Sequence, residues 1–259
     1  MRVSRNAMGT LFVGGALSLT LAALVYPSLL GVRTVSAAAS RVIADTQWGP
    51  LTEGDRDFVV KVRAAGLWEH PVARMGVEKG TDRRVVTAGR TLVDGHAALD
   101  TTVRKIAPLL DITLPNLASP QQTGFVSRLT TDSKGEQFDR DFANILRQTD
   151  GSFFTTVAQI RSTTKNTLVR ALAEQADHIF MNHIAALEQT GLVDIDQVLA
   201  QQTTAPDLPD SDLTPPPGVA GQQLSVLTPP PNPSASPVDI DRIAGSEDGV
   251  TSAPANGKK

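Results

Sequence analysis

Cysteine is absent from the 259 residues of this chain. Its absence excludes disulfide bonds, thiolate catalysis, and zinc or iron–sulfur sites with cysteine ligands. It does not assign a redox compartment, because a chain without cysteine is stable in either. A metal site in this protein would have to use histidine and carboxylate ligands.

Aromatic residues and positive charge are also scarce. Phe, Trp and Tyr together make up 4% of the chain, and the formal net charge is −3. The core must therefore be built mainly from Val, Leu, Ile and Ala, with a few Phe. Because proteins that bind nucleic acid usually carry a basic face, we expect no nucleic-acid partner.

Familiar catalytic motifs are missing as well. The sequence has no Gly-rich phosphate loop, no nucleophile elbow and no HExxH motif. The di-iron pattern of helical bundles needs Glu-x-x-His on two helices, whereas Glu174 precedes His178 by four residues. We therefore expect a protein without enzymatic activity. A metal-dependent redox or hydrolytic enzyme is the alternative.

The N-terminal residues 1–40 have the features of an export leader. Arg2 and Arg5 precede an uncharged run over residues 6–32, and an alanine cluster follows at residues 37–39. A positive start, an apolar stretch and small residues at the end are typical of a signal peptide. The run is also long enough to span a bilayer as a signal anchor. Both alternatives predict an extracytoplasmic protein, secreted or held at the cell envelope by an uncleaved leader.

Helical periodicity dominates residues 52–192. The most regular stripe lies between Asp82 and Leu110, where apolar or small residues recur at steps of three and four. Its members are Val85, Gly89, Leu92, Leu99, Val103, Ile106 and Leu110, and His96 takes one position among them. Three further long stripes predict an all-α domain, an antiparallel four-helix bundle with one long crossover between two hairpins.

Capping signals place the ends of these helices. Ser, Thr, Asp or Asn before a helix, and an acid three residues later, are typical of its first turn. We expect Gly80 to end the first helix in a left-handed conformation. The predicted helices run from Thr52 to Gly80, from Asp82 to Leu110, from Ser119 to Leu129 in the crossover, from Ser133 to Thr163, and from Asn166 to Gln189. Residues 41–51 are interpreted as a connector.

Proline changes the character of the chain from Gln201 onwards. The pentapeptide Leu-Thr-Pro-Pro-Pro occurs at residues 213–217 and again at 227–231. Such a segment buries too little apolar surface to offset its chain entropy, so we predict that residues 201–259 are disordered with polyproline II character. A spacer through a cell wall is one role for it, and a ligand for a polyproline-binding partner is another.

Four polar residues interrupt the four long stripes, one on each helix: Glu69, His96, Asp150 and His183. Two carboxylates and two imidazoles that converge in a bundle core are suited to a divalent metal ion. His178 competes with His183, because its level along the bundle matches better while its place on the stripe does not. The other interpretation is that these buried groups satisfy one another or touch solvent. We expect His70, beside Pro71, to face solvent.

Three sequence runs resemble a known family. They are Asp55-Arg56-Asp57-Phe58-Val59, Gly66-Leu67-Trp68-Glu69 and Leu92-Val93-Asp94-Gly95-His96. They resemble the exported bacterial domain-of-unknown-function 4142 family, whose members are often labelled predicted outer-membrane proteins. The resemblance covers about residues 52–192.

This resemblance implies a ferritin-like four-helix bundle, export from the cytoplasm, and no particular activity. It also implies functional positions at Glu69, His96 and His183. In the third helix, family members usually carry Asp-His where this chain has Thr149-Asp150.

Overall fold

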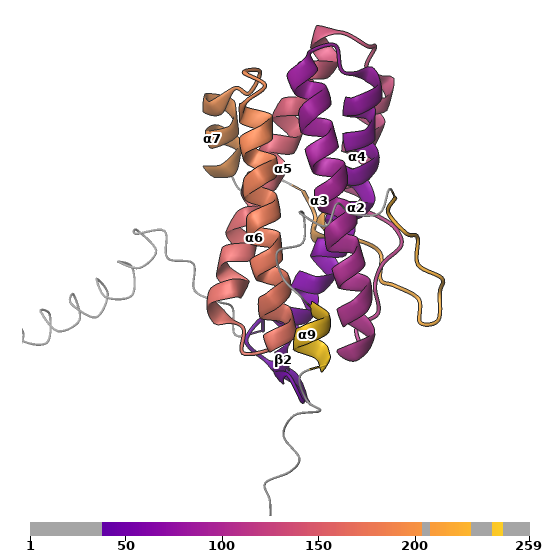
Figure 1. The fold of residues 1–259 in the computed structure, drawn as a ribbon, viewed down its shortest axis with the longest axis vertical. Helices are drawn as coiled ribbons and strands as arrows, with labels where there is room; N and C mark the ends of the chain where they lie inside the picture. The colour runs from indigo at the N-terminus through magenta and orange to yellow at the C-terminus, as the bar shows by residue number, and fades with distance from the viewer. Residues whose placement is uncertain (1–37, 204–207, 229–239, 246–259) are drawn as a thin grey trace, which may run out of the picture. The chain divides into compact units, whose positions relative to one another are not determined.

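The computed structural model describes residues 38–203, 208–228 and 240–245 (Figure 1). Residues 1–40 and residues 41–259 are separate units, and the described helices and strands belong to the second. The predicted leader lies almost wholly outside the described residues. Among the helices that are described, none is both long enough and apolar enough to cross a membrane.

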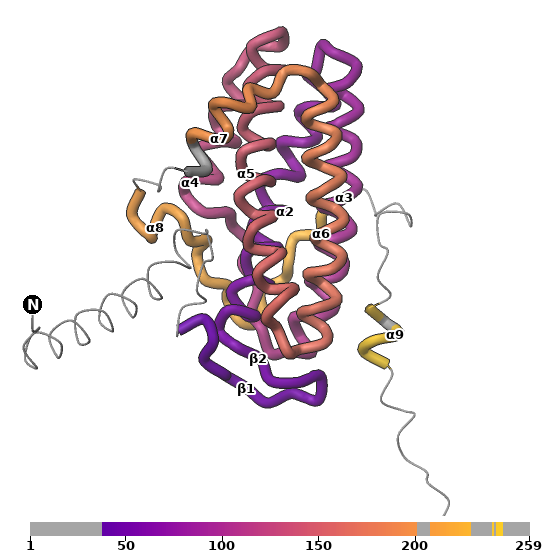
Figure 2. Tube along the Cα trace, turned by 90° about the vertical axis from the view of Figure 1, so that its left-hand side faces the viewer, coloured from indigo at the N-terminus to yellow at the C-terminus, as the bar shows by residue number. Residues whose placement is uncertain are grey.

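The chain is mostly helical, and four long helices make up its core. They are α2 (Glu53–Lys79), α3 (Arg83–Leu109), α5 (Glu136–Thr163) and α6 (Thr167–Glu188). Three residues link α2 to α3 and three link α5 to α6, so each pair forms an antiparallel hairpin. The hairpins pack with α3 against α6 and α2 against α5 (Figures 1 and 2). We call these four the core helices.

The predicted caps are found at most helix starts. Thr52 and Asp55 form a reciprocal capping box, in which Thr52 Oγ1 accepts from the Asp55 amide at 3.1 Å and Asp55 accepts from the Thr52 amide at 2.9 Å. Asp82 caps α3 and Asn166 caps α6. These local hydrogen bonds satisfy amides that a helix leaves unpaired at its first turn.

Two predicted helix ends are wrong in detail. Gly80 has φ −53° and ψ 133°, so it ends α2 without the left-handed conformation. The capping box predicted at Ser133 is absent, because Gly135 takes the N-cap position of α5 and makes no side-chain bond. Gly135 has φ +148°, a conformation that residues with a side chain rarely adopt.

Residues 41–51 form a β-hairpin rather than a plain connector. Strands β1 (Val42–Thr46) and β2 (Gly49–Thr52) pair antiparallel, with Thr46 opposite Gly49 across a two-residue turn. Gly49 has φ +103° and packs against the backbone of Lys165, so a side chain there would be both strained and crowded. The hairpin thereby reaches the start of α6.

The crossover between the two hairpins contains α4 (Pro120–Thr131), as predicted. Ser119 caps it through a reciprocal bond with Gln122, and proline occupies the first helical position. The helix packs on α2 and α5 through the buried Leu129. The crossover therefore adds apolar contacts to the core.

Apolar side chains fill the space between the core helices in two clusters. One lies toward the β-hairpin and includes Phe58, Leu99, Leu172 and Phe180. The other lies toward the opposite end and includes Trp68, Leu92, Phe138 and Leu146. Along α3, α5 and α6 the predicted polar residues fall between the two clusters.

The C-terminal part of the chain contains short helices and one extended stretch. The helices are α7 (Ile195–Thr203), α8 (Asp210–Leu213) and α9 (Ile240–Gly245). We call residues 214–228 the strap. It lies beside α2 and α3, as the orange-to-yellow segment in Figure 1. The disorder predicted from Gln201 onwards stays a prediction, but this described stretch makes defined contacts with the core.

Candidate metal centre

Each core helix contributes one buried polar residue to a single cluster. Glu69 comes from α2, His96 from α3, Asp150 from α5 and His183 from α6, and each residue is at most 2% exposed. The apolar stripe of each helix faces the core, so a polar residue within the stripe must face it too. The four residues that the sequence analysis selected all lie together.

Distances between these side chains are short. Glu69 Oε2 lies 2.8 Å from His96 Nε2, and Asp150 Oδ2 lies 3.7 Å from His183 Nδ1. The imidazole rings of His96 and His183 have their centres 4.9 Å apart. One ligand atom each from Glu69, His96 and His183 can be chosen so that all lie within 4.8 Å of one another.

Most polar atoms of the cluster lack a hydrogen-bond partner. Within the described residues, none is found in hydrogen-bonding geometry for Glu69 Oε2 or for any nitrogen or carboxylate oxygen of His96, Asp150 and His183. Buried polar atoms are nearly always paired, because an unpaired one costs about 1–3 kcal/mol. Such a concentration of unpaired ligand atoms therefore suggests that something else binds there.

Burial controls the charge of the two carboxyl groups. It raises the pKa of Glu69 to about 8, although the facing Asp150 carboxyl lowers it in part. Burial also raises the pKa of Asp150 well above its usual range, and the neighbouring Glu69 adds to this effect. Without a bound cation, Glu69 is therefore mainly protonated at neutral pH, and burial favours the protonated form of Asp150 as well.

The two imidazoles respond to the same burial in the opposite direction. Burial lowers the pKa of His96 to about 4 and lowers the pKa of His183 well below its usual range. Both rings are therefore neutral at physiological pH. A neutral imidazole has a free lone pair, which is the form that binds metal ions.

The structure decides between the two candidate histidines of α6. His183 is 1% exposed and lies in the cluster, whereas His178 is on the exposed face of the same helix. The position of a residue on the apolar stripe was therefore the better guide than its level along the bundle.

Gly95 is a site residue that the sequence analysis missed. A Cβ atom at this position would collide with the ring of His183 and would come within 2.7 Å of Ile179. The ring of His183 thus packs directly against the backbone of α3. A glycine directly before His96 was the available signal, but its partner on α6 cannot be read from the sequence.

His70 was expected to face solvent, and that expectation is wrong. It is 5% exposed, and its Nε2 atom has no hydrogen-bond partner among the described residues. Burial lowers the pKa of His70 to about 4, with a smaller contribution from nearby His96. The strap covers this side chain, and no pattern around His70 in the sequence indicates that cover.

A family profile described as a domain of unknown function, DUF4142, matches residues 41–190. The chain belongs to this family. The match includes all four core helices, the cluster and the β-hairpin, and it assigns no activity. No curated protein and no solved structure matches the chain.

Proposed function

We propose that this protein binds one divalent transition-metal ion in its helical core. Glu69, His96 and His183 would hold the ion, and Asp150 would lie beside them as a further ligand or as the partner that orients His183. The observation that carries the proposal is the set of buried ligand atoms that lack hydrogen-bond partners. A bound cation would pair with one of these atoms from each ligand residue.

The main alternative is that the cluster satisfies itself. Glu69 and His96 are close enough for a hydrogen bond, yet their geometry does not form one. The Glu69 and Asp150 carboxyl groups also face each other closely enough to share a hydrogen bond, but that bond would leave the ring nitrogens of His96 unpaired. A metal ion would also displace the protons that burial keeps on Glu69 and Asp150.

The ligand types restrict the choice of metal. Two imidazoles with carboxylate oxygens favour borderline ions such as Zn²⁺, Fe²⁺, Mn²⁺ or Cu²⁺ over Ca²⁺ and Mg²⁺, which prefer oxygen ligands. All four residues are at most 2% exposed, so a substrate has no direct contact with the ion in this conformation. We therefore favour metal binding over a metal-dependent reaction.

We further propose that the fold is a ferritin-like bundle at the cell envelope. Two helical hairpins joined by a long crossover are consistent with that arrangement. The positive and apolar leader supports export. Mass spectrometry of the protein from its native cells would distinguish cleavage near residues 36–40 from retention of the leader, and a mature protein found in the cytoplasm would contradict export.

Metal analysis of the purified full chain tests the binding proposal. We expect a near-stoichiometric transition metal, and a melting temperature that rises with added Zn²⁺ or Mn²⁺ and falls with chelator, because a ligand specific to the folded state stabilises it. His183→Leu should abolish this response. His178→Leu is the matched control, since His178 is exposed on the same helix. If the wild type contains no metal and shows no response, the proposal is wrong.

A further inference from the structure

The strap is fastened to a second buried polar cluster, which lies outside the metal centre. Arg63 on α2 and Asp100 on α3 form an ion pair with almost no exposed side-chain surface. Arg63 also donates to the carbonyl oxygen of Ser225 at 2.9 Å, and Asp100 accepts from the amide of Leu227 at 3.1 Å. Two charged groups that the core would otherwise bury thus bind the backbone of the strap.

Asn116, in the loop after α3, adds two further bonds to the strap. Its side-chain amide donates to the Gln223 carbonyl at 2.8 Å, and its oxygen accepts from the Ser225 amide at 3.1 Å. These bonds use only backbone groups of the strap. They therefore hold it in one register, as a neighbouring strand would.

The strap contacts α2 and α3 about one helical turn from the metal centre. Leu227 lies against Gly66, about one turn before Glu69, and its amide binds Asp100, about one turn after His96. Because α2 and α3 are antiparallel, both contacts lie on the same side of the two ligands, toward the β-hairpin. At a rise of about 1.5 Å per residue, Gly66 is about 4.5 Å from Glu69 along α2 and Asp100 is about 6 Å from His96 along α3.

His70 lies under the end of the strap. The backbone of Thr228 lies close enough to accept a hydrogen bond from its ring, and the ring nitrogen Nε2 has no partner among the described residues. His70 directly follows Glu69 in the chain, and its pKa is affected by both Thr228 and His96, so its imidazole lies near both the strap and the buried centre. This nitrogen offers a ligand to an ion passing inward from the strap.

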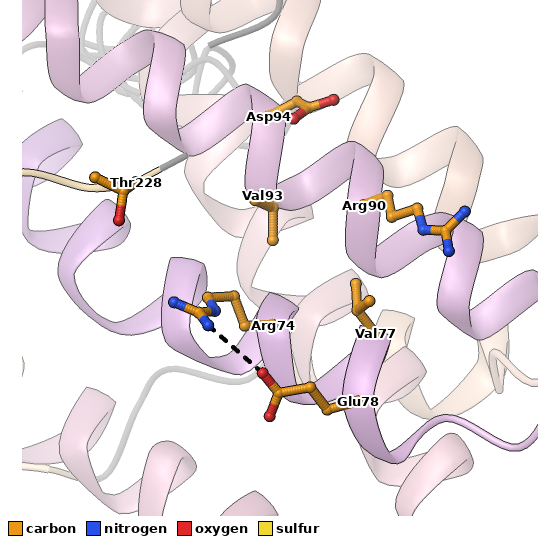
Figure 3. Close-up of a pocket in the computed structure, with 7 residues that line it drawn as sticks. All are labelled: Arg74, Val77, Glu78, Arg90, Val93, Asp94 and Thr228. Atoms are coloured by element: carbon orange, nitrogen blue, oxygen red, sulfur yellow. Dashed lines mark ion pairs between the residues drawn. The ribbon is translucent and has the colours of Figure 1, made fainter. Parts of the chain in front are cut away.

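An open groove of about 650 Å³ begins where the described strap ends (Figure 3). It lies between α2 and α3, and Thr228 forms part of its edge. Its charged lining consists of two acidic side chains, Glu78 and Asp94, and two arginines, Arg74 and Arg90. Arg74 pairs with Glu78 at 3.6 Å, so the charges of this lining balance and the groove does not select for a cation.

We propose that residues 224–228 act as a lid on the metal centre, and that a divalent ion enters by way of His70 when the lid opens. The inference rests on the proposed metal-binding function and adds how the ion reaches a fully buried site. Opening breaks the hydrogen bonds of the lid to Arg63, Asp100 and Asn116. It costs few apolar contacts, because Leu224 and Leu227 are only partly buried and the other lid residues are exposed. Local opening of such segments is cheap compared with global unfolding.

Leu227 packs against Gly66, so a substitution at Gly66 can displace the lid without changing a proposed metal ligand. A Cβ atom at Gly66 would lie 2.9 Å from Leu227 Cδ1, so Gly66→Leu should push the lid away. The control is Gly124→Leu on α4, where nothing lies within 4 Å of a Cβ atom. Hydrogen exchange at the Ser225 and Leu227 amides, both hydrogen-bonded in the closed lid, reports whether the lid has moved.

The probe is Co²⁺, whose visible absorption changes when it binds. In the full chain, this absorption measures the rate of Co²⁺ uptake and the rate of its removal by a chelator. Gly66→Leu should accelerate both rates on the order of tenfold with little change in Kd, as expected of a gate. Gly124→Leu should leave both unchanged. His70→Leu should slow uptake while Kd is retained, because it removes the ligand on the path.

Three results would overturn the proposal that residues 224–228 act as a lid. One is unchanged rates in Gly66→Leu although the Ser225 and Leu227 amides exchange fast. Another is fast exchange of these amides in the wild type, which would mean that the lid is open already. The third is uptake in His70→Leu at the wild-type rate. If the wild type binds no Co²⁺ at all, the proposed metal function fails first, and the lid fails with it.

Discussion

At the residue scale, Glu69 makes stability depend on pH in the metal-free protein. Its pKa is about 8 in the folded state against an ordinary value of 4.5, so between these values the folded state holds a proton that the unfolded state has released. Stability therefore falls as pH rises through this range. His96 acts in the opposite direction, but only between about 4 and 6.5.

Above pH 6.5 the effect of the carboxyl groups is no longer opposed by the histidines. We expect the free energy of unfolding of the metal-free protein to fall between pH 6.5 and 8, by about 2 kcal/mol from Glu69 alone. Glu69→Gln should remove this part of the fall, while Glu78→Gln, a change at an exposed position, should not. Urea denaturation at several pH values measures the free energy of unfolding. An equal fall with pH in Glu69→Gln and in the wild type would contradict the role of Glu69.

Gly95 makes a prediction about geometry rather than charge. Alanine is the better helix former by about 1 kcal/mol, so Gly95→Ala would stabilise α3 if the space were free. Because the added Cβ would collide with the His183 ring, we expect the helical content to be kept while affinity for Zn²⁺ falls at least about tenfold, as when a supporting group of a metal site is lost. Gly124→Ala, in open space, should bind Zn²⁺ like the wild type. Equal affinity in Gly95→Ala would mean that His183 is not a ligand.

At the scale of elements, Asp139 ties α5 to the turn between α2 and α3. Its buried carboxylate accepts from the amide of Thr81 at 3.1 Å and from the amide of Asp82 at 2.9 Å, where α3 begins. We expect Asp139→Ala to lower the free energy of unfolding by about 2–4 kcal/mol, because two amides lose their acceptor. Glu78→Ala should cost less than about 0.5 kcal/mol. Chemical denaturation measures the free energy of unfolding of both variants. Equal losses in Asp139→Ala and Glu78→Ala would mean that Asp139 does not tie α5 to the turn.

Helix ends were predictable where the stabilising bonds are local. The Thr52 and Asp55 pair, and the Ser119 and Gln122 pair, close over three residues, so the sequence contains the whole interaction. The β-hairpin was not predictable in this way. Its strands are short and largely exposed, and it contacts the start of α6, more than 100 residues later.

The same distinction applies to the candidate site. A polar residue in an apolar stripe is visible in sequence, and this signal found Glu69, His96, Asp150 and His183. The roles of Gly95 and His70 depend on which segment packs against them, and neither partner is close in the chain. His70 is covered by a strap that begins more than 140 residues later, so periodicity on α2 alone suggested an exposed position.

At the scale of the whole molecule, the question is which residues are needed to fold. The sequence analysis predicts that residues 52–192 fold alone, but the structure has the β-hairpin packed under the helical core. Leu51 is 2% exposed, the Trp48 carbonyl accepts from the Thr167 amide at 2.8 Å, and Asn166 binds the Gly49 carbonyl at 3.1 Å. The family match also begins at residue 41. The hairpin is therefore part of the folding unit.

Three fragments test this directly: residues 52–192, 41–192 and 41–203. We expect all three to show helical circular dichroism, with 52–192 less stable than 41–192 by about 3–5 kcal/mol, since it loses the burial of Leu51 and the bonds to the start of α6. Adding α7 should stabilise further, because Val198 is 2% exposed. A loss of about 3–5 kcal/mol on removing the β-hairpin would be a large part of the stability of an ordinary domain, about 5–15 kcal/mol. Fragment 52–192 should therefore melt at a much lower temperature than 41–192. Equal melting of 52–192 and 41–192 would show that the hairpin only rests on the core, and a coil spectrum from 41–203 would contradict an independent helical domain.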